Sequence, residues 1–124
     1  MQINETRNIQ GVWIDDVGVE GICINGHCYQ QPICITNSAV QPVIKSSVTE
    51  LSAEDFCEAI SYHPEIILIG TGSKTRFIDP RLNVELVQHG IGIECMSTDA
   101  ACSTFSVLLG EGRNVWAWLW PLSD

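Results

Sequence analysis

The residues best suited to chemistry lie in a glycine-rich loop that carries positive charge. Gly70 and Gly72 follow an apolar run at residues 66–69, and Lys74 and Arg76 come shortly after them. The backbone N–H groups of such a loop, the start of a following helix and basic side chains all favour negative charge. The loop therefore indicates a possible anion site outside the carboxyl end of a strand, where ligands of α/β sheets usually bind.

Two known phosphate-binding patterns do not fit this loop. A P-loop has its lysine directly after the second glycine, whereas here a serine separates the two. The dinucleotide pattern fails because Thr75 occupies the position of its third glycine. The simpler interpretation is that the glycines serve only the turn and that Arg76 pairs with Asp79 or Glu65. We favour this interpretation over an anion site.

Cysteines offer a second kind of chemistry. In a hairpin that turns at Asn25 and Gly26, Cys23 faces Cys28. Directly opposed residues are close enough for a disulfide, and with His27 beside them the pair could supply part of a zinc site. We favour reduced, mostly buried thiols, because free cysteine is usually buried and no export signal is visible.

Cys102 is a candidate nucleophile. It lies in the first turn of a predicted helix, where the helix dipole can lower a thiol pKa, and His89 is the candidate base. Nothing in the sequence places His89 near Cys102. We therefore favour Cys102 as a small residue packed under the sheet, and we predict no catalytic residue.

The elements that position these residues form a hairpin-rich first half and a strand-helix-strand second half. This order predicts an α/β fold with a mixed sheet. The run at 66–69 indicates a central strand, and Asp79 before Pro80 indicates a helix start. We expect a short strand at 11–14, a turn at Asp15 and Asp16, and a connection over 37–50. The other expected elements are strands at 21–24, 27–29, 33–36, 91–96 and 115–120, and helices from Ser52 to about Tyr62, Pro80 to about Gln88 and Ser97 or Thr98 to about Leu109.

The expected last strand carries three tryptophans. Trp116, Trp118 and Trp120 alternate with apolar residues, so both faces of this strand are apolar. The usual explanation is a strand covered on both sides, which we favour. The alternative is an exposed aromatic patch of the kind that marks protein interfaces.

Length and charge limit the possible functions. A chain of 124 residues is long enough to bury its own core, and we expect one domain over residues 1–124. The net charge of −9 argues against nucleic acid, because phosphate backbones are bound through many basic side chains. Neither a signal peptide nor a membrane-spanning stretch is visible. We expect a soluble cytoplasmic protein, a monomer or weak homodimer, with no metal and no cofactor.

The second half also carries a set of residues that is specific only as a combination. It consists of Pro64, Glu65, Ile69, Gly70, Thr71, Gly72, the run Gly90-Ile91-Gly92-Ile93-Glu94, Thr98, Ala100, Ala101, Cys102, Thr104, Phe105, Leu108, Glu111, Gly112, Arg113 and Pro121. Over residues 64–121 the chain thereby resembles the Mth-type domain family, which includes mitochondrial complex I assembly factor three and the adipogenesis-associated Mth-type domain protein. It departs from the family at Ser106, where members usually have Asn, and at Pro42, where many have Trp.

The resemblance implies a three-layer α/β fold with a mixed sheet and a role in assembling or contacting other proteins. Our first hypothesis is therefore a non-enzymatic adaptor or assembly-type factor with a protein partner. The second is a binder of an anionic small molecule, or an enzyme acting on one. In both, the candidate site is a groove formed by Gly70, Thr71, Gly72, Lys74, Arg76, Thr98 and Thr104.

Overall fold

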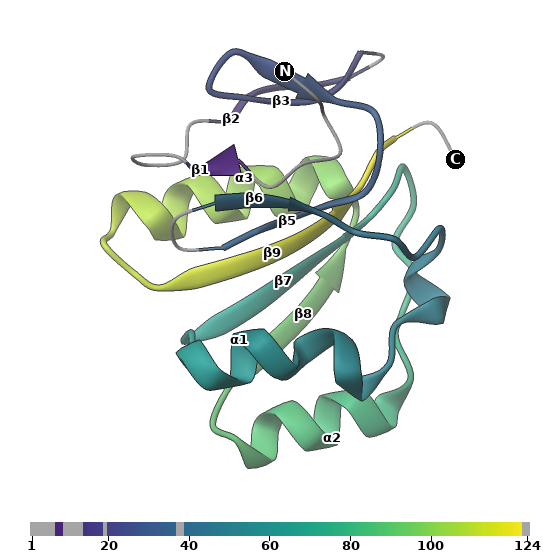
Figure 1. The fold of residues 1–124 in the computed structure, drawn as a ribbon, viewed down its shortest axis with the longest axis vertical. Helices are drawn as coiled ribbons and strands as arrows, with labels where there is room; N and C mark the ends of the chain where they lie inside the picture. The colour runs from purple at the N-terminus through teal and green to yellow at the C-terminus, as the bar shows by residue number, and fades with distance from the viewer. Residues whose placement is uncertain (1–6, 9–13, 19, 37–38, 123–124) are drawn as a thin grey trace.

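The structure, a computed structural model, describes residues 7–8, 14–18, 20–36 and 39–122 of the chain. They form a six-stranded mixed sheet, a smaller three-stranded sheet and helices (Figure 1). The order of the large sheet is β1 (Arg7–Asn8), β6 (Ala39–Pro42), β5 (Ile33–Ile35), β9 (Val115–Trp120), β7 (Ile66–Thr71) and β8 (Gly92–Met96). The small sheet contains β2 (Ile14–Gly18), β3 (Gly21–Ile24) and β4 (His27–Tyr29). The helical segments are η1 (Val48–Glu50), η2 (Ala53–Phe56), α1 (Cys57–Tyr62), α2 (Pro80–Gln88) and α3 (Thr98–Gly110).

Strand β7 lies inside the large sheet, as its apolar run predicts. It pairs in parallel with β8 on one side and with β9 on the other. Ile67, Leu68 and Ile69 are fully buried. Strands β5 and β6 continue the sheet beyond β9 in antiparallel pairs. The mixed sheet and the strand-helix-strand second half are thus confirmed.

The large sheet separates two apolar cores. Trp116, Trp118 and Trp120 face the core that α1 and α2 cover, together with Ile67 and Ile69 of β7. The alternating residues of β9 (Val115, Ala117, Leu119) face the second core, which α3 and the small sheet cover (Figure 1). This arrangement confirms the three layers. All six residues of β9 are buried, so the alternative of an exposed tryptophan patch is wrong.

The helices begin where their capping residues predict. The Asp79 side chain accepts a hydrogen bond from the Arg81 N–H at the start of α2, and Pro80 is the first helical residue. Ser52 and Asp55 form a capping box, although the first turn after it is a 3₁₀ helix. Ser97 caps α3 by accepting from the Ala100 N–H. None of the helices in the described part of the chain is long and apolar enough to cross a membrane.

The hairpin has the predicted register, but its cysteines differ from the favoured interpretation. Cys23 lies opposite Cys28, and the two form a disulfide with their Cα atoms 3.9 Å apart. The expectation of reduced thiols at these two positions was therefore wrong, because direct cross-strand pairing outweighs the general burial preference of cysteine. Within the described residues, no group of three or more His, Cys, Asp or Glu is placed to hold a metal ion.

Two expectations for the first half need correction. Asp15 and Asp16 are not a turn but part of β2, where a register shift keeps both side chains exposed and Asp15 accepts a hydrogen bond from the Gly26 N–H at 2.7 Å. The expected connection at 37–50 contains β6 and η1. Strand β6 is short and ends at Pro42, so it lacks the run of strand-forming residues that identifies a strand in a sequence. Of the expected strand at 11–14, only Ile14 lies within the described residues.

Candidate functional site

The carboxyl ends of β7, β8 and β9 meet at one edge of the sheet because these strands run in parallel. After β7 the chain passes to the face covered by α2, and after β8 it passes to the face covered by α3. Such a divergence between neighbouring strands usually opens a ligand-binding crevice. The predicted site residues lie around this edge.

Hydrogen bonds within the protein close the space between β7 and β8. The Thr98 hydroxyl accepts from the Gly72 N–H at 2.8 Å and donates to the carbonyl oxygen of Trp120. The Thr71 hydroxyl lies 2.6 Å from the carbonyl oxygen of Lys74 and 3.1 Å from that of Met96, and the two oxygens share its one proton. Thr71 and Thr98 are both buried, and their hydroxyls tie the glycine loop to the ends of β8 and β9.

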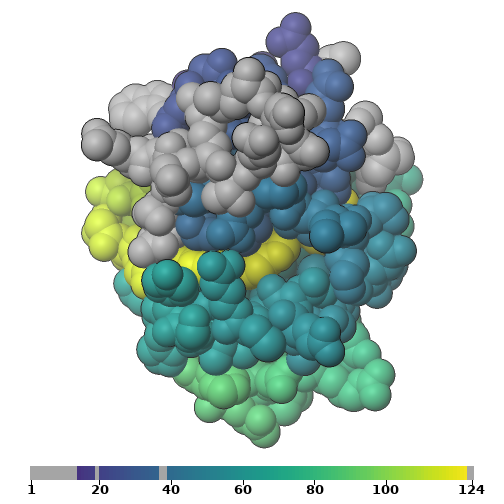
Figure 2. Space-filling model, in the orientation of Figure 1, coloured from purple at the N-terminus to yellow at the C-terminus, as the bar shows by residue number. Residues whose placement is uncertain are grey.

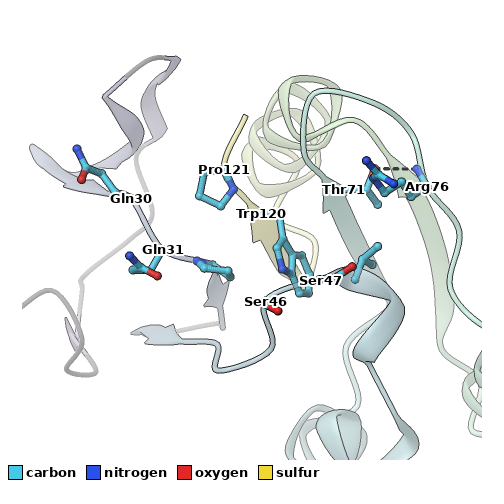
Figure 3. A pocket seen from close by; sticks show the side chains of 10 residues that line it. Gln30, Gln31, Ser46, Ser47, Thr71, Arg76, Trp120 and Pro121 are labelled. Atoms are coloured by element: carbon cyan, nitrogen blue, oxygen red, sulfur yellow. Dashed lines mark hydrogen bonds between the residues drawn. The ribbon is translucent and has the colours of Figure 1, made fainter. Parts of the chain in front are cut away.

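An open pocket lies at the other side of β7, beside the end of β9. Its volume is about 390 Å³, and its lining comes from four separate segments. Gln30 and Gln31 lie on one side, Thr71 and Arg76 on the other, and Trp120 between them (Figure 3). The full lining is Gln30, Gln31, Pro32, Ser46, Ser47, Val48, Thr71, Arg76, Trp120 and Pro121.

Only part of the predicted set of site residues lines this pocket. Thr71 and Arg76 do, and the Arg76 N–H donates to the Thr71 hydroxyl at 2.9 Å. The others do not line the pocket: Gly70 belongs to β7, Gly72 and Lys74 to the loop after it, and Thr98 and Thr104 to α3. Gly70 packs closely against Thr98 and Leu119, and the Thr104 hydroxyl contacts the Met96 sulfur at 3.6 Å.

Sequence reasoning missed most of the lining. Two of its segments flank the antiparallel strands: Gln30 and Gln31 precede β5, and Ser46 and Ser47 follow β6. They reach the pocket only because β5 pairs with β9. The one available signal was the polar Gln-Gln pair directly before Pro32 and an apolar strand.

Carboxylates order the loops around the pocket. Glu50 accepts hydrogen bonds from the backbone N–H groups of Ser46 and Ser47 and from the Ser46 hydroxyl, and these bonds lower the pKa of Glu50. The Trp120 indole N–H donates to the Lys45 carbonyl oxygen at 3.2 Å. The sequence suggested Asp79 or Glu65 as partners for Arg76. Instead, Asp79 pairs with Arg81 at 2.7 Å, and Glu65 pairs with Arg113 at 3.3 Å.

The structure separates the candidate nucleophile from its candidate base. Cys102 lies on α3 in one core, whereas His89 ends α2 on the opposite face of the sheet. Burial, with a smaller contribution from the negative charge of Asp99, raises the pKa of Cys102 to about 12. The thiol is therefore protonated at neutral pH and has no thiolate to offer as a nucleophile.

Comparisons with known proteins agree with the fold. A family model described as a protein of unknown function (DUF498/DUF598) matches residues 14–120. NADH dehydrogenase [ubiquinone] 1 alpha subcomplex assembly factor 3 of Rattus norvegicus is 32% identical over 114 residues, which cover 90% of this chain and 62% of that protein. The chain thus spans about three fifths of the length of this relative.

Solved structures give the same result. A Bordetella parapertussis protein superposes with a TM-score of 0.81 at 27% identity, covering 89% of this chain and 95% of that one. A Mth938-like domain of Bordetella pertussis shares the fold with a TM-score of 0.77 at 22% identity, covering 98% and 88%. The sheet topology, the family model over residues 14–120 and these likenesses together show that the chain belongs to the DUF498/DUF598 family of Mth-type domains, which includes complex I assembly factor 3.

Proposed function

We propose that the chain is a non-enzymatic factor of the assembly type that acts by binding a protein partner. The observation that carries this proposal is the extent of its similarity to complex I assembly factor 3, which covers 90% of the chain and so includes most of the sheet and helices described above. The match covers 62% of that relative, so the proposal rests on the shared part alone.

The chemistry of the open pocket supports a binding role. Its lining contains amides, hydroxyls, prolines, a tryptophan and one arginine, and the described lining includes no His, Cys or carboxylate that could act as general base or nucleophile. Tryptophan, arginine and amide side chains are well suited to contact an extended protein segment. The pocket is thus better equipped to bind than to transform a ligand.

Separation of native complexes from the host cell tests this proposal. The chain, tagged at its own locus, is expected to migrate with an incomplete form of a larger protein complex and to be absent from the finished complex. Deletion of the gene is expected to make that incomplete form accumulate. Unchanged abundance and subunit content of every complex after deletion would contradict an assembly role.

A second candidate function is binding of an anionic small molecule at the open pocket, which Thr71 and Arg76 of the predicted set line. The observation that favours it is local charge: Arg76 lines the pocket and Lys74 lies on the same loop, in a chain of net charge −9. Carboxylate and phosphate anions are bound well by such groups.

A thermal-shift screen with di- and tricarboxylates and phosphorylated metabolites tests the second function. Stabilisation by one anion is expected to disappear when Lys74→Ala and Arg76→Ala are combined. Arg113→Ala, which removes a cation that pairs with Glu65 elsewhere on the chain, serves as the control and is expected to keep the shift. An equal shift in the double variant would exclude this site.

A further inference from the structure

A second groove lies away from the carboxyl edge, between α1 and the antiparallel part of the large sheet. Its volume is about 220 Å³. In Figure 2 yellow atoms of the C-terminal part of the chain reach the surface in a seam between the blue atoms of β5 and β6 and the teal atoms of α1. We call this the Trp116 groove. Its lining is Cys34, Gln41, Pro42, Val43, Ile44, Lys45, Asp55, Glu58, Trp116 and Trp118.

Aromatic rings form the inner part of the groove. The ring of Trp116 lies 5.6 Å from that of Tyr62 and 6.1 Å from that of Trp118, as measured between centroids. Trp116 is 1% exposed, and its indole N–H has no hydrogen-bond acceptor among the described residues. A buried donor without an acceptor costs stability, and because this ring is covered, its N–H can report on a ligand in the groove but does not bind one directly.

The charge at the groove is negative. Lys45 and Asp55 form an ion pair at 3.2 Å, and the Lys45 ammonium also donates to the Glu50 carbonyl oxygen at 2.8 Å. Glu58, by contrast, has no cationic partner among the described residues. Burial and, secondarily, the charge of Glu58 raise the pKa of the Cys34 thiol, and both residues line the groove. One uncompensated negative charge therefore lies beside the aromatic rings.

We propose that the Trp116 groove binds a lysine or arginine side chain of the protein partner, with Glu58 as the ionic contact and with the aliphatic stem of the basic side chain over the apolar floor that Trp116 and Trp118 line. This inference rests on the proposed assembly-type function and names the chemistry that its partner must present.

Size and chemistry both favour this occupant. A long basic side chain fits a groove of about 220 Å³ better than a whole folded surface does. The aliphatic stem of a lysine or arginine packs on an apolar surface while its charged end pairs with a carboxylate. Ile44 at the rim is 96% exposed and offers an apolar contact to residues that flank the basic one. The net charge of −9 also attracts a basic segment over longer distances.

Nuclear magnetic resonance of the indole N–H groups tests the proposal directly. The probes are two capped peptides, acetyl-Gly-Lys-Gly-amide and acetyl-Gly-Arg-Gly-amide, with norleucine and glutamate peptides of the same length as controls. The basic peptides are expected to move the Trp116 indole signal in a saturable manner at millimolar concentration, and the controls are not. No saturable shift with either basic peptide, or an equal shift with norleucine, would overturn the proposal.

A pair of matched variants separates the groove from general acidity. Glu58→Gln is expected to weaken binding of the basic peptides by about fivefold to tenfold, because it removes the ionic contact. Glu54→Gln is the control, since Glu54 is exposed in η2 and does not line the groove; it is expected to leave binding within about twofold. Both changes lie on exposed residues, so the fold is retained. Equal effects of the two variants would overturn the role of Glu58.

Free lysine distinguishes a protein segment from a small metabolite. Its own carboxylate would lie near Glu58, so we expect it to bind more weakly than the capped lysine peptide. Tighter binding of free lysine would overturn a protein occupant. If the peptides bind but deletion of the gene changes no complex, the result supports binding at the groove and contradicts the assembly role. If deletion changes a complex and the peptides do not bind, the result supports the assembly role and contradicts binding of a basic side chain at the groove.

Discussion

The two sides of the β7 carboxyl end differ in how they use the same kinds of residue. Toward β8, the hydroxyls of Thr71 and Thr98 are engaged with backbone groups, and the crevice is closed. Toward β9, a pocket of about 390 Å³ remains open, and loops of the antiparallel half line it together with Thr71, Arg76 and Trp120. The closed side contains most of the residues that the sequence suggested as ligand contacts.

Hydroxyl residues beside a switch point can thus already be hydrogen-bonded to backbone groups of the protein itself. A glycine loop with hydroxyl residues near parallel strand ends can bind a ligand, but its hydroxyls can also satisfy backbone groups that strand ends leave unpaired. The open side formed mostly from residues outside any motif, with Thr71 and Arg76 as the exceptions. If the closed side holds the fold together and the open side does not, substitutions on the closed side should cost much more stability than changes on the open side.

The largest effect is expected for Thr98→Val on the closed side. The change keeps the shape of the side chain but leaves the Gly72 N–H and the Trp120 carbonyl oxygen without the partner that each now has. We expect the free energy of unfolding to fall by about 2–6 kcal/mol, since two buried groups are left unsatisfied and each costs about 1–3 kcal/mol. Urea denaturation measures it. Thr104→Val is the control, and an equal loss there would remove the distinction.

A somewhat smaller loss is expected for Gly70→Ala. A Cβ at this position would lie 2.8 Å from the Leu119 Cδ2 atom and 3.0 Å from the Thr98 Cα atom, so the strand end would have to shift. Overpacking of this kind costs about 1–3 kcal/mol. Urea denaturation again measures the effect. Gly110→Ala, where a Cβ meets nothing within 4 Å, is the control and is expected to be neutral or slightly stabilising. If Gly70→Ala left the stability unchanged, Leu119 and Thr98 would be able to move and make room for the added methyl group.

Little change in stability is expected for Lys74→Gln at the exposed surface of the glycine loop. Surface substitutions of this kind alter the free energy of unfolding by less than about 0.5 kcal/mol. Chemical denaturation is again the measurement. A loss as large as that of Thr98→Val would mean that the basic side chain of Lys74, like the threonine hydroxyls, holds the loop in place.

The smallest effect is a local response to pH on the open side. The folded-state pKa of Glu50 is lowered by its bonds from Ser46 and Ser47, so its contribution is complete above the ordinary glutamate pKa of about 4.3 and is lost as the pH falls through the lowered value. We expect the Ser46 and Ser47 amides to lose hydrogen-exchange protection in that acidic range, after correction for intrinsic rates. The Gly72 amide, held by the hydroxyl of Thr98, has no such titrating acceptor and is expected to stay protected. Equal loss at all three amides would indicate global unfolding instead.

Local sequence signals predicted the parts of the fold that local physics determines. Asn25-Gly26 gave the hairpin register, Asp79-Pro80 the start of α2, and the run at 66–69 the central strand. The alternation of tryptophans gave a strand buried on both faces. In each case a few consecutive residues are sufficient, because turn geometry, capping and side-chain alternation depend on near neighbours.

The features that the sequence did not predict depend on residues that are far apart in the chain. The partners of Thr98 are Gly72 and the Trp120 carbonyl, and no local pattern links the three. The disulfide was not predicted, because the general preference of cysteine for burial was given more weight than the hairpin register that places Cys23 opposite Cys28. Strand β6 is defined by its neighbours β5 and β1 rather than by its own residues. The open pocket likewise exists only once β5 pairs with β9.

The alternation along β9 also has an optical consequence. It directs three of the four tryptophans of the chain toward the core under α1 and α2, whereas the layer built from α3 and the hairpin contains Tyr29 but none of these three indoles. Intrinsic fluorescence excited at the indole band will therefore report chiefly on one layer. Following it alongside a label on exposed Ser106 of α3 would reveal whether the two layers melt together or in sequence.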